Sequence, residues 1–309
     1  MSLILFLSCT SSELTQRESI EWVELAHNGD LLSVRWVKSN TGLLKNQAHV
    51  RLNYFKAEQN PIEYSFHAPE SEHIWAPNDI KIGPHELQKK EDLWTMQLHD
   101  DELNLRIEND SSGTSPCQFE TKDWAVEIIS LQAKDQGWLQ SQKRSLSLQG
   151  DSFIIKHQGS KRALAPHRWL LLQASSLQLF YEDWNDFQYG CIRKNDQLIA
   201  LSKDAVEWSD DGARIKTPEL VLNITWRKEL GAEDPYLHLL SGERWIAESS
   251  FPLNKVHWIQ GYAQEESSAG FYPVIFRYQG STPPKIKQRK TKPTFPNPPK
   301  SDSLKTQKE

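Results

Sequence analysis

The amino-acid sequence predicts an all-β protein made of two consecutive antiparallel β-barrels packed together. Three observations support this fold class. Apolar and polar residues alternate with a period of two along most of the chain, and clusters of turn-forming residues separate the alternating segments every 10 residues or so, roughly the spacing of an all-β domain. In addition, no window of about a dozen residues has the 3.6-residue period of a convincing amphipathic helix. Many short strands of this kind are typical of a sandwich or a barrel.

Nine segments carry the strand pattern in chain order. They are residues 31–39, 49–57, 93–101, 103–110, 124–133, 152–159, 177–184, 220–229 and 273–280. Runs rich in Gly, Asn, Asp and Ser indicate turns at residues 27–30, 109–116, 209–213 and 231–234. A short helical turn is an alternative for residues 134–149, but we expect these residues to form strand or loop instead.

The pattern breaks near residues 145–160 and divides the body into comparable halves. We therefore expect an N-terminal barrel over residues 19–144 and a C-terminal barrel over residues 145–279. Residues 1–18 would be a signal remnant and tether, and residues 280–309 a disordered tail. About eight strands close a small barrel, which is wide enough to hold one ligand.

The composition is that of a soluble globular body, with 38% hydrophobic and 25% charged residues in 309. No segment after the start approaches the roughly 20 apolar residues that span a bilayer. The net charge of −5 combines an acidic body with the tail 280–309, which has eight Lys and Arg against Asp302 and Glu309 and also six prolines. Such a tail is typical of an extended, disordered segment. The acidic body argues against nucleic acid as a partner.

The first residues read MSLILFLSCTSSELTQ. The stretch FLSC followed by TSSE resembles a bacterial lipobox, in which the cysteine, here Cys9, carries the lipid. Phe6 and Leu7 stand where Leu and a small residue are commoner, and no basic residue precedes the apolar run, so a charged region would lie upstream. We expect a lipoprotein of the bacterial cell envelope, anchored through Cys9. The alternative is an apolar N-terminus with an inert buried thiol.

Two further cysteines, Cys117 and Cys191, are present. If the protein is exported, these two cysteines could form a disulfide, but the sequence alone does not establish that bond. The chain has no CxxC pair and no Cys/His cluster at zinc spacing, so we expect no metal and no other cofactor.

Three longer stretches carry a family resemblance. Residues 79–110 place a strand ending in Ile82-Gly83 before a hairpin and a strand with an L-x-L pattern. Residues 153–184 hold a strand ending in Gly, a His/Trp motif and the strand after it, and residues 258–278 hold two aromatic-rich segments with acids between them. These stretches resemble the tandem lipocalin-like family of carotenoid 1,2-hydratases, AttH-type proteins and survival-factor proteins. The resemblance implies two lipocalin-like barrels over about residues 20–279, and a hydratase or isomerase type of chemistry.

The hydratases of this family usually show a motif like Gly-Tyr-His-Asp-His-x-Trp-Gly. The nearest match here is residues 163–169, Ala-Leu-Ala-Pro-His-Arg-Trp, which keeps His167 and Trp169 but has Ala165 or Pro166 at the acidic position. Adding water to an isolated C=C bond needs a strong proton donor, normally a buried carboxyl with a raised pKa. Another acid would have to supply that proton.

Asp183 and Glu265 are the candidate catalytic acids, with His167 as their partner. Asp183 lies in an aromatic-rich segment and Glu265 follows Tyr262. Each also has a structural explanation, because residues 182–186 have turn composition, Glu265 fits a surface turn, and a lone histidine is often a hydrogen-bonded structural residue.

Alternation in a strand puts Tyr181 and Asp183 on one face and Glu182 and Trp184 on the other. The aromatic candidates for lining a ligand cavity all come from the second half, and His167 and Arg168 are candidate polar anchors for a head group. The aromatic residues are Trp169, Tyr181, Trp184, Tyr189, Trp226, Trp258 and Tyr262.

These observations favour a binding protein for an elongated hydrophobic molecule, such as a lipid or an isoprenoid. Two alternatives stay open. One is a hydratase or isomerase acting on a polyene or lipid. The other is a β-sandwich that binds envelope glycan or protein, since Trp residues also stack on sugars.

Overall fold

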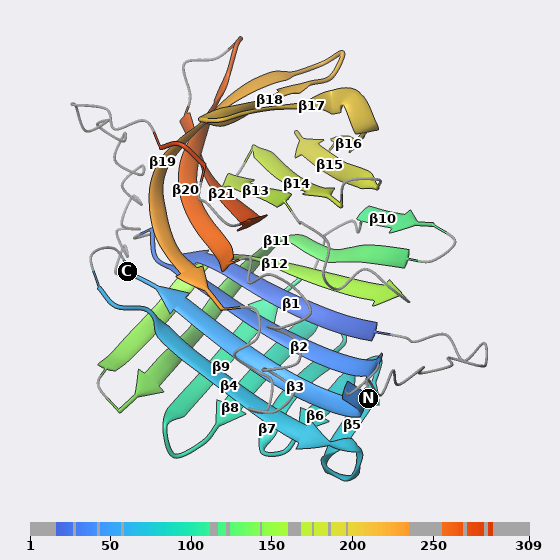
Figure 1. Ribbon diagram of the computed structural model, residues 1–309, viewed down its shortest axis with the longest axis vertical. Helices are drawn as coiled ribbons and strands as arrows, with labels where there is room; N and C mark the ends of the chain where they lie inside the picture. Colours follow the sequence, from blue (N-terminus) through green and yellow to red (C-terminus); the bar gives the residue numbers. More distant parts are fainter. Residues whose placement is uncertain are drawn as a thin grey trace, which may run out of the picture.

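The computed structural model describes residues 17–26, 29–41, 44–56, 59–111, 117–121, 124–142, 144–159, 168–174, 176–184, 187–195, 197–234, 255–267, 271–280 and 284–286. Strands dominate these residues, and the helical structure among them is limited to two 3₁₀ turns, Glu70–Glu72 and Lys203–Ala205. The predicted all-β class is confirmed, as two curled antiparallel sheets (Figure 1).

The first sheet has twelve strands. They are β1 (Arg17–Ala26), β2 (Leu31–Thr41), β3 (Leu44–Phe55), β4 (Ile62–Pro69), β5 (His73–Ala76), β6 (Asp79–Ile82), β7 (His85–Lys90), β8 (Leu93–His99), β9 (Leu103–Asp110), β10 (Cys117–Glu120), β11 (Trp124–Ser141) and β12 (Arg144–Gly159). The order in the sheet is β4-β3-β2-β1-β12-β11-β9-β8-β7-β6-β5, and β10 pairs with β11 beside this path.

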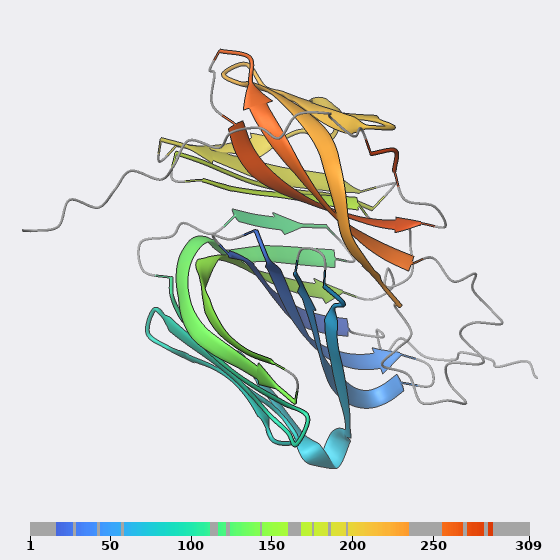
Figure 2. The ribbon, with the colours of Figure 1, turned by 90° about the vertical axis from the view of Figure 1, so that its left-hand side faces the viewer.

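The second sheet has nine strands in the order β16-β15-β14-β13-β21-β20-β19-β18-β17. They are β13 (Arg168–Ala174), β14 (Leu177–Asp183), β15 (Gln188–Lys194), β16 (Gln197–Leu201), β17 (Val206–Ser209), β18 (Gly212–Lys216), β19 (Val221–Glu233), β20 (Lys255–Glu265) and β21 (Phe271–Gly280). We call residues 17–159 the first unit and residues 168–280 the second unit; Figure 2 shows them stacked, with β11 and β12 curving around the first.

The boundary between the units falls later than the sequence suggested. β12 pairs with β1 from Arg17 opposite Gly159 to Ala26 opposite Gly150, and it also pairs with β11. The predicted division at residue 145 was wrong, because the turn before Arg144 is the tip of a long hairpin and not a linker. The β1–β12 pairing joins strands β1–β4 to strands β5–β9 and β11 within the one sheet.

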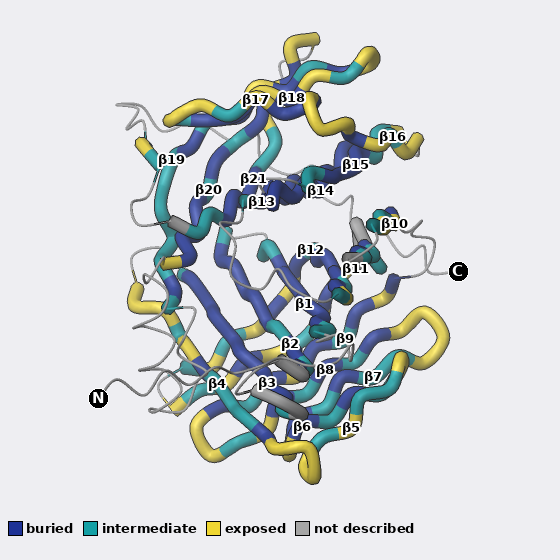
Figure 3. Tube along the Cα trace, turned by 45° about the vertical axis from the view of Figure 1, so that its right-hand side comes forward, coloured by how far each residue is buried: buried dark blue, intermediate teal, exposed yellow. Residues whose placement is uncertain are grey.

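Alternation along the strands separates three apolar cores. In β14, Leu177, Leu179 and Tyr181 point into the interior of the second unit, while Phe180 points towards the first unit. The interior of the first unit is filled in the same way, with Trp22 among its buried side chains. Figure 3 shows burial concentrated along the strands and exposure at the outer turns.

The third core lies between the units. Phe55 and Phe153 of the first unit meet Trp169 and Trp258 of the second there, and the Phe55 and Trp258 ring centroids are 5.8 Å apart. Burying one Phe side chain stabilises a protein by about 1.5–3 kcal/mol, so this shared core contributes to holding the two units together.

A disulfide adds a covalent link at the same interface. Cys117 of β10 and Cys191 of β15 are bonded, and both are buried. The sequence left this pairing open. The bond joins a side strand of the first sheet to the second unit.

Candidate functional site

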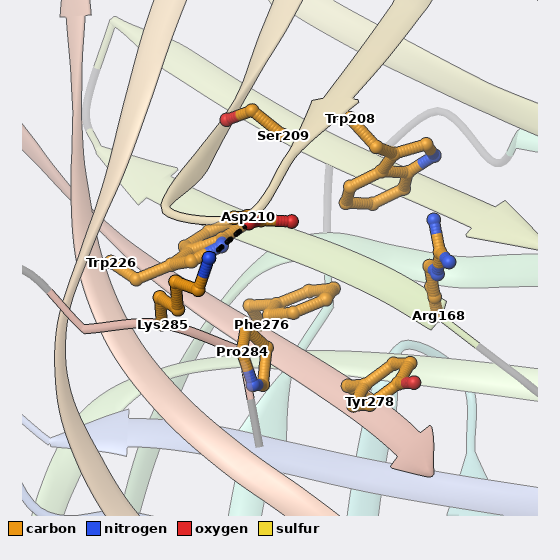
Figure 4. Close-up of a pocket in the computed structure, with 9 residues that line it drawn as sticks. All are labelled: Arg168, Trp208, Ser209, Asp210, Trp226, Phe276, Tyr278, Pro284 and Lys285. Carbon is orange, nitrogen blue, oxygen red and sulfur yellow. Dashed lines mark hydrogen bonds and ion pairs between the residues drawn. The ribbon is translucent and has the colours of Figure 1, made fainter. Parts of the chain in front are cut away.

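A groove of about 420 Å³ opens on the inner face of the second unit. Aromatic side chains from β17, β19 and β21 form its walls, and a half-buried arginine from β13 stands at one end (Figure 4). The lining residues are Arg168, Trp208, Ser209, Asp210, Trp226, Phe276, Tyr278, Pro284 and Lys285.

The aromatic wall is a series of nearly parallel rings. Trp226 and Phe276 are stacked, with centroids 4.3 Å apart and planes at 6°. Tyr278 continues the series 6.1 Å from Phe276 at 19°, because residues two apart on β21 share a face. The ring centroid of Trp208, on the edge strand β17, lies 5.4 Å from that of Phe276. Flat, conjugated or long apolar molecules fit such a surface.

Arg168 is the positively charged group of the groove. It points inward because it shares a face of β13 with Leu170 and Leu172 of the second-unit core. Its guanidinium carbon lies 5.4 Å from the Trp208 ring and 5.7 Å from the Tyr278 ring. Two rings hold the guanidinium, but within the described residues it forms no ion pair. Its N–H donors are therefore available to an anionic ligand.

Tyr181 and Asp183 lie on the inward face of β14, as alternation predicted. Asp183 is opposite Arg168 in the strand register and accepts a hydrogen bond from Gln188 at 3.2 Å. Burial, followed by the negative charge of Asp183, raises the pKa of Tyr181, so its hydroxyl stays protonated. That hydroxyl is buried and has no hydrogen-bond partner among the described residues.

Four of the predicted lining residues lie elsewhere. Trp169, Trp184, Tyr189 and Trp258 belong to the core between the units. Trp169 and Trp258 meet edge to face, with centroids 5.2 Å apart. Their side chains pack the interface instead of lining the groove, so only Arg168 and Trp226 of the predicted ligand residues line it directly.

Tyr262 and Glu265 do not line the groove either. Tyr262 accepts a hydrogen bond from Arg227 at 2.8 Å and lies under its guanidinium. Glu265 accepts from Lys194 at 2.5 Å and from Ser267 at 2.7 Å, and these hydrogen bonds lower its pKa. An ionised, paired carboxylate is a poor proton donor, which argues against Glu265 as an acid. His167 and Cys9 lie outside the described residues.

Sequence reasoning missed the three other aromatic residues of the groove, namely Trp208, Phe276 and Tyr278. It also missed the lining residues Ser209, Asp210, Pro284 and Lys285. The alternation of residues 273–280 carried a usable signal, because Val274, Phe276 and Tyr278 share one face of the strand. Trp208 stands in a four-residue strand, which is too short for a periodic signal.

The first unit contains a pair of buried acids that the sequence did not single out. Glu24 is 1% exposed, and neither of its carboxyl oxygens has a hydrogen-bond partner among the described residues. Burial, then the charges of Asp135 and Asp151, raises the pKa of Glu24 to about 8. Asp135 instead accepts hydrogen bonds from Trp22 at 2.9 Å, Ser152 at 2.9 Å and Asn109 at 2.5 Å.

Across the described part of the chain, His, Cys, Asp and Glu residues form no cluster of three that would hold a metal ion. The same residues include no helix long and apolar enough to cross a membrane.

Solved structures with a similar fold are known. An AttH-like protein from Nitrosomonas europaea superposes with a TM-score of 0.62 at 9% identity, over 87% of this chain and 93% of its own. CghA in complex with Sch210972 gives 0.61 at 7% identity, over 86% and 88%. Kievitone hydratase from Nectria haematococca gives 0.53 at 13% identity, over 87% and 90%.

No protein-family model and no curated protein sequence matches the chain. At these identities the structural likeness defines the fold, and it supports at fold level the resemblance to the tandem lipocalin-like family.

Proposed function

We propose that the protein binds an elongated, unsaturated molecule with an anionic group in the groove of the second unit. The observation that carries the proposal is the position of Arg168, an inward-pointing guanidinium held by two rings and without an ion-pair partner in the described residues. A ligand carboxylate or phosphate would pair with it, and the ligand body would lie along Trp226, Phe276 and Tyr278.

We further propose that the protein works in an oxidising compartment, as a cell-envelope lipoprotein anchored through Cys9. Disulfides persist in such compartments, and the buried Cys117–Cys191 bond supports export. Mass spectrometry of natively extracted protein tests this directly. A diacylglyceryl adduct on Cys9 is the expected result, and an unmodified Cys9 in membrane-extracted protein would contradict it.

A second candidate function is a hydratase or isomerase reaction on a molecule in the same groove. Asp183 and Tyr181 do not line the groove, but both are next to residues that do: Asp183 is opposite Arg168 in the strand register, and the Tyr181 ring lies 6.1 Å from the Trp208 ring. The hydroxyl of Tyr181, which is protonated and has no hydrogen-bond partner among the described residues, favours this reaction. Asp183→Asn should then abolish turnover of a polyene substrate and leave its binding intact. Unchanged turnover would remove Asp183 as the acid.

Energy transfer from tryptophan to parinaric acid, a conjugated fatty acid, tests the binding proposal. We expect saturable transfer on mixing with the intact protein, and no loss of this signal when a maltooligosaccharide is added. Trp208→Leu, in the groove wall, should weaken the signal. Trp138→Leu is the matched control, because Trp138 is 44% exposed on β11 of the first unit. Equal effects of the two substitutions would contradict binding in this groove.

A further inference from the structure

The last described residues of the chain lie at the mouth of the groove. β21 ends at Gly280, and Pro284 and Lys285 are both lining residues. Figure 4 shows Pro284 beside Phe276 and Lys285 extended towards Asp210. Asp210 belongs to the turn between β17 and β18, at the far edge of the second sheet from β13. Residues 284–286 therefore lie beside β21, through Pro284 next to Phe276, and beside the edge hairpin, through Lys285 paired with Asp210.

A single ion pair holds this segment. Lys285 Nζ lies 2.7 Å from Asp210 Oδ2, and the two side chains are 81% and 74% exposed. For residues 284–286 this is the sole hydrogen bond or ion pair within the described chain. An exposed pair of this kind shifts an equilibrium by about fivefold at most. The contact is strong enough to favour the closed position and weak enough to open readily.

We propose that residues 284–286 are a strap over the aromatic groove, latched by the Lys285–Asp210 ion pair, and that release of the latch controls how fast a ligand enters and leaves. This inference rests on the proposed binding function of the groove. The strap covers Trp226 and Phe276 at the mouth, whereas Arg168 lies at the other end of the lining. Release of the Lys285–Asp210 ion pair therefore changes the rates at which a ligand enters and leaves the groove. Arg168, in contrast, determines the affinity for the ligand.

Stopped-flow mixing with the methyl ester of parinaric acid tests the strap. The ester has no charge, so changes in protein charge do not alter its attraction to Arg168. In the full chain, Asp210→Asn and Lys285→Gln should each raise the association and dissociation rates by up to about fivefold, the limit set by one exposed ion pair. The two substitutions change the net charge in opposite directions, so a shared effect reports the loss of the pair.

Glu266→Gln is the matched control, because it removes another exposed ion pair of the second unit, with Arg214 at 2.9 Å, away from the groove lining. Its rates should equal those of the unchanged protein. Adding salt is an independent test of the ion pair. About 1 M salt reduces the screening length to about 3 Å and so weakens an exposed ion pair. Salt should accelerate ester exchange in the unchanged protein and in Glu266→Gln, and should leave the two latch variants unaffected.

Equal exchange rates in all four proteins at low salt would overturn the strap while leaving the binding proposal intact. Failure of the ester and of parinaric acid to bind any of the four would instead overturn the binding function itself.

Discussion

Glu21 of the first unit and Arg277 of the second form a buried ion pair, with Arg277 Nη1 2.5 Å from Glu21 Oε1. Arg35 donates to the same oxygen at 2.9 Å, and the Arg277 guanidinium lies 4.2 Å from the Trp169 ring centroid. Although burial opposes ionisation of Glu21, the charges of Arg277 and then Arg35 lower its pKa to about 2. The two units are therefore joined through charges that are withdrawn from solvent.

Arg277→Leu should destabilise the protein by about 3–5 kcal/mol, because it leaves Glu21 buried without its closest partner. Urea unfolding at neutral pH, followed by tryptophan fluorescence, measures this loss. Arg106→Leu is the control, since the pair of Arg106 with Glu108 is about half exposed and should contribute less than about 1 kcal/mol. Equal urea midpoints for the two variants would contradict a stabilising role for the inter-unit pair.

Loss of the inter-unit disulfide should also destabilise the fold. The bond closes a loop of 74 residues, and removing a native disulfide of this kind costs about 2–4 kcal/mol. Cys117→Ser should lower the urea midpoint accordingly, and Cys9→Ser should not. Peptide mapping without reductant should recover Cys117 linked to Cys191. Recovery of both as free thiols from protein matured in the envelope would contradict the proposed compartment.

The stability of the first unit should fall as the pH rises. The pKa of Glu24 is raised to about 8 in the folded protein, against about 4.5 in the unfolded chain. The folded state therefore binds more protons, so the stabilising effect of the neutral carboxyl is complete below about pH 4.5 and is lost progressively up to about pH 8.

Glu24→Gln should make the protein more stable than the unchanged chain at pH 8–9 and flatten this part of the pH profile. Asp135 should still give the variant a smaller dependence of stability on pH, because burial also raises the pKa of Asp135, to about 7. Glu63→Gln, at an exposed position of β4, is the control and should leave the profile as it is. Thermal unfolding between pH 5 and pH 9 gives the comparison, and parallel profiles for all three proteins would contradict a buried neutral Glu24.

Local patterns predicted the strands and their faces well. The alternation that placed Tyr181 with Asp183, and Glu182 with Trp184, holds in the structure: Tyr181 faces the second-unit core and Trp184 the core between the units. Two of the predicted ligand residues, Arg168 and Trp226, do line the groove. These outcomes follow from the fixed period of a strand, which a short stretch of sequence already contains.

The failures involve long-range pairing. The unit boundary depends on β12 meeting β1, more than a hundred residues away in sequence, and no local signal specifies that partner. β13 is buried on both faces, so Trp169 and Leu170 look equally internal although only Leu170 faces the second-unit interior. The Cys117–Cys191 pairing likewise requires the two units to be docked.

The most direct test of the account compares the affinities of parinaric acid and its methyl ester. Arg168→Gln should weaken binding of the acid by about 10- to 100-fold, the loss expected for a hydrogen bond to a charged group, and should leave the affinity for the ester nearly unchanged. Arg214→Gln, which lies outside the groove lining, should alter neither affinity. Equal losses for acid and ester, or no loss for the acid, would contradict an anion-anchoring groove in the second unit.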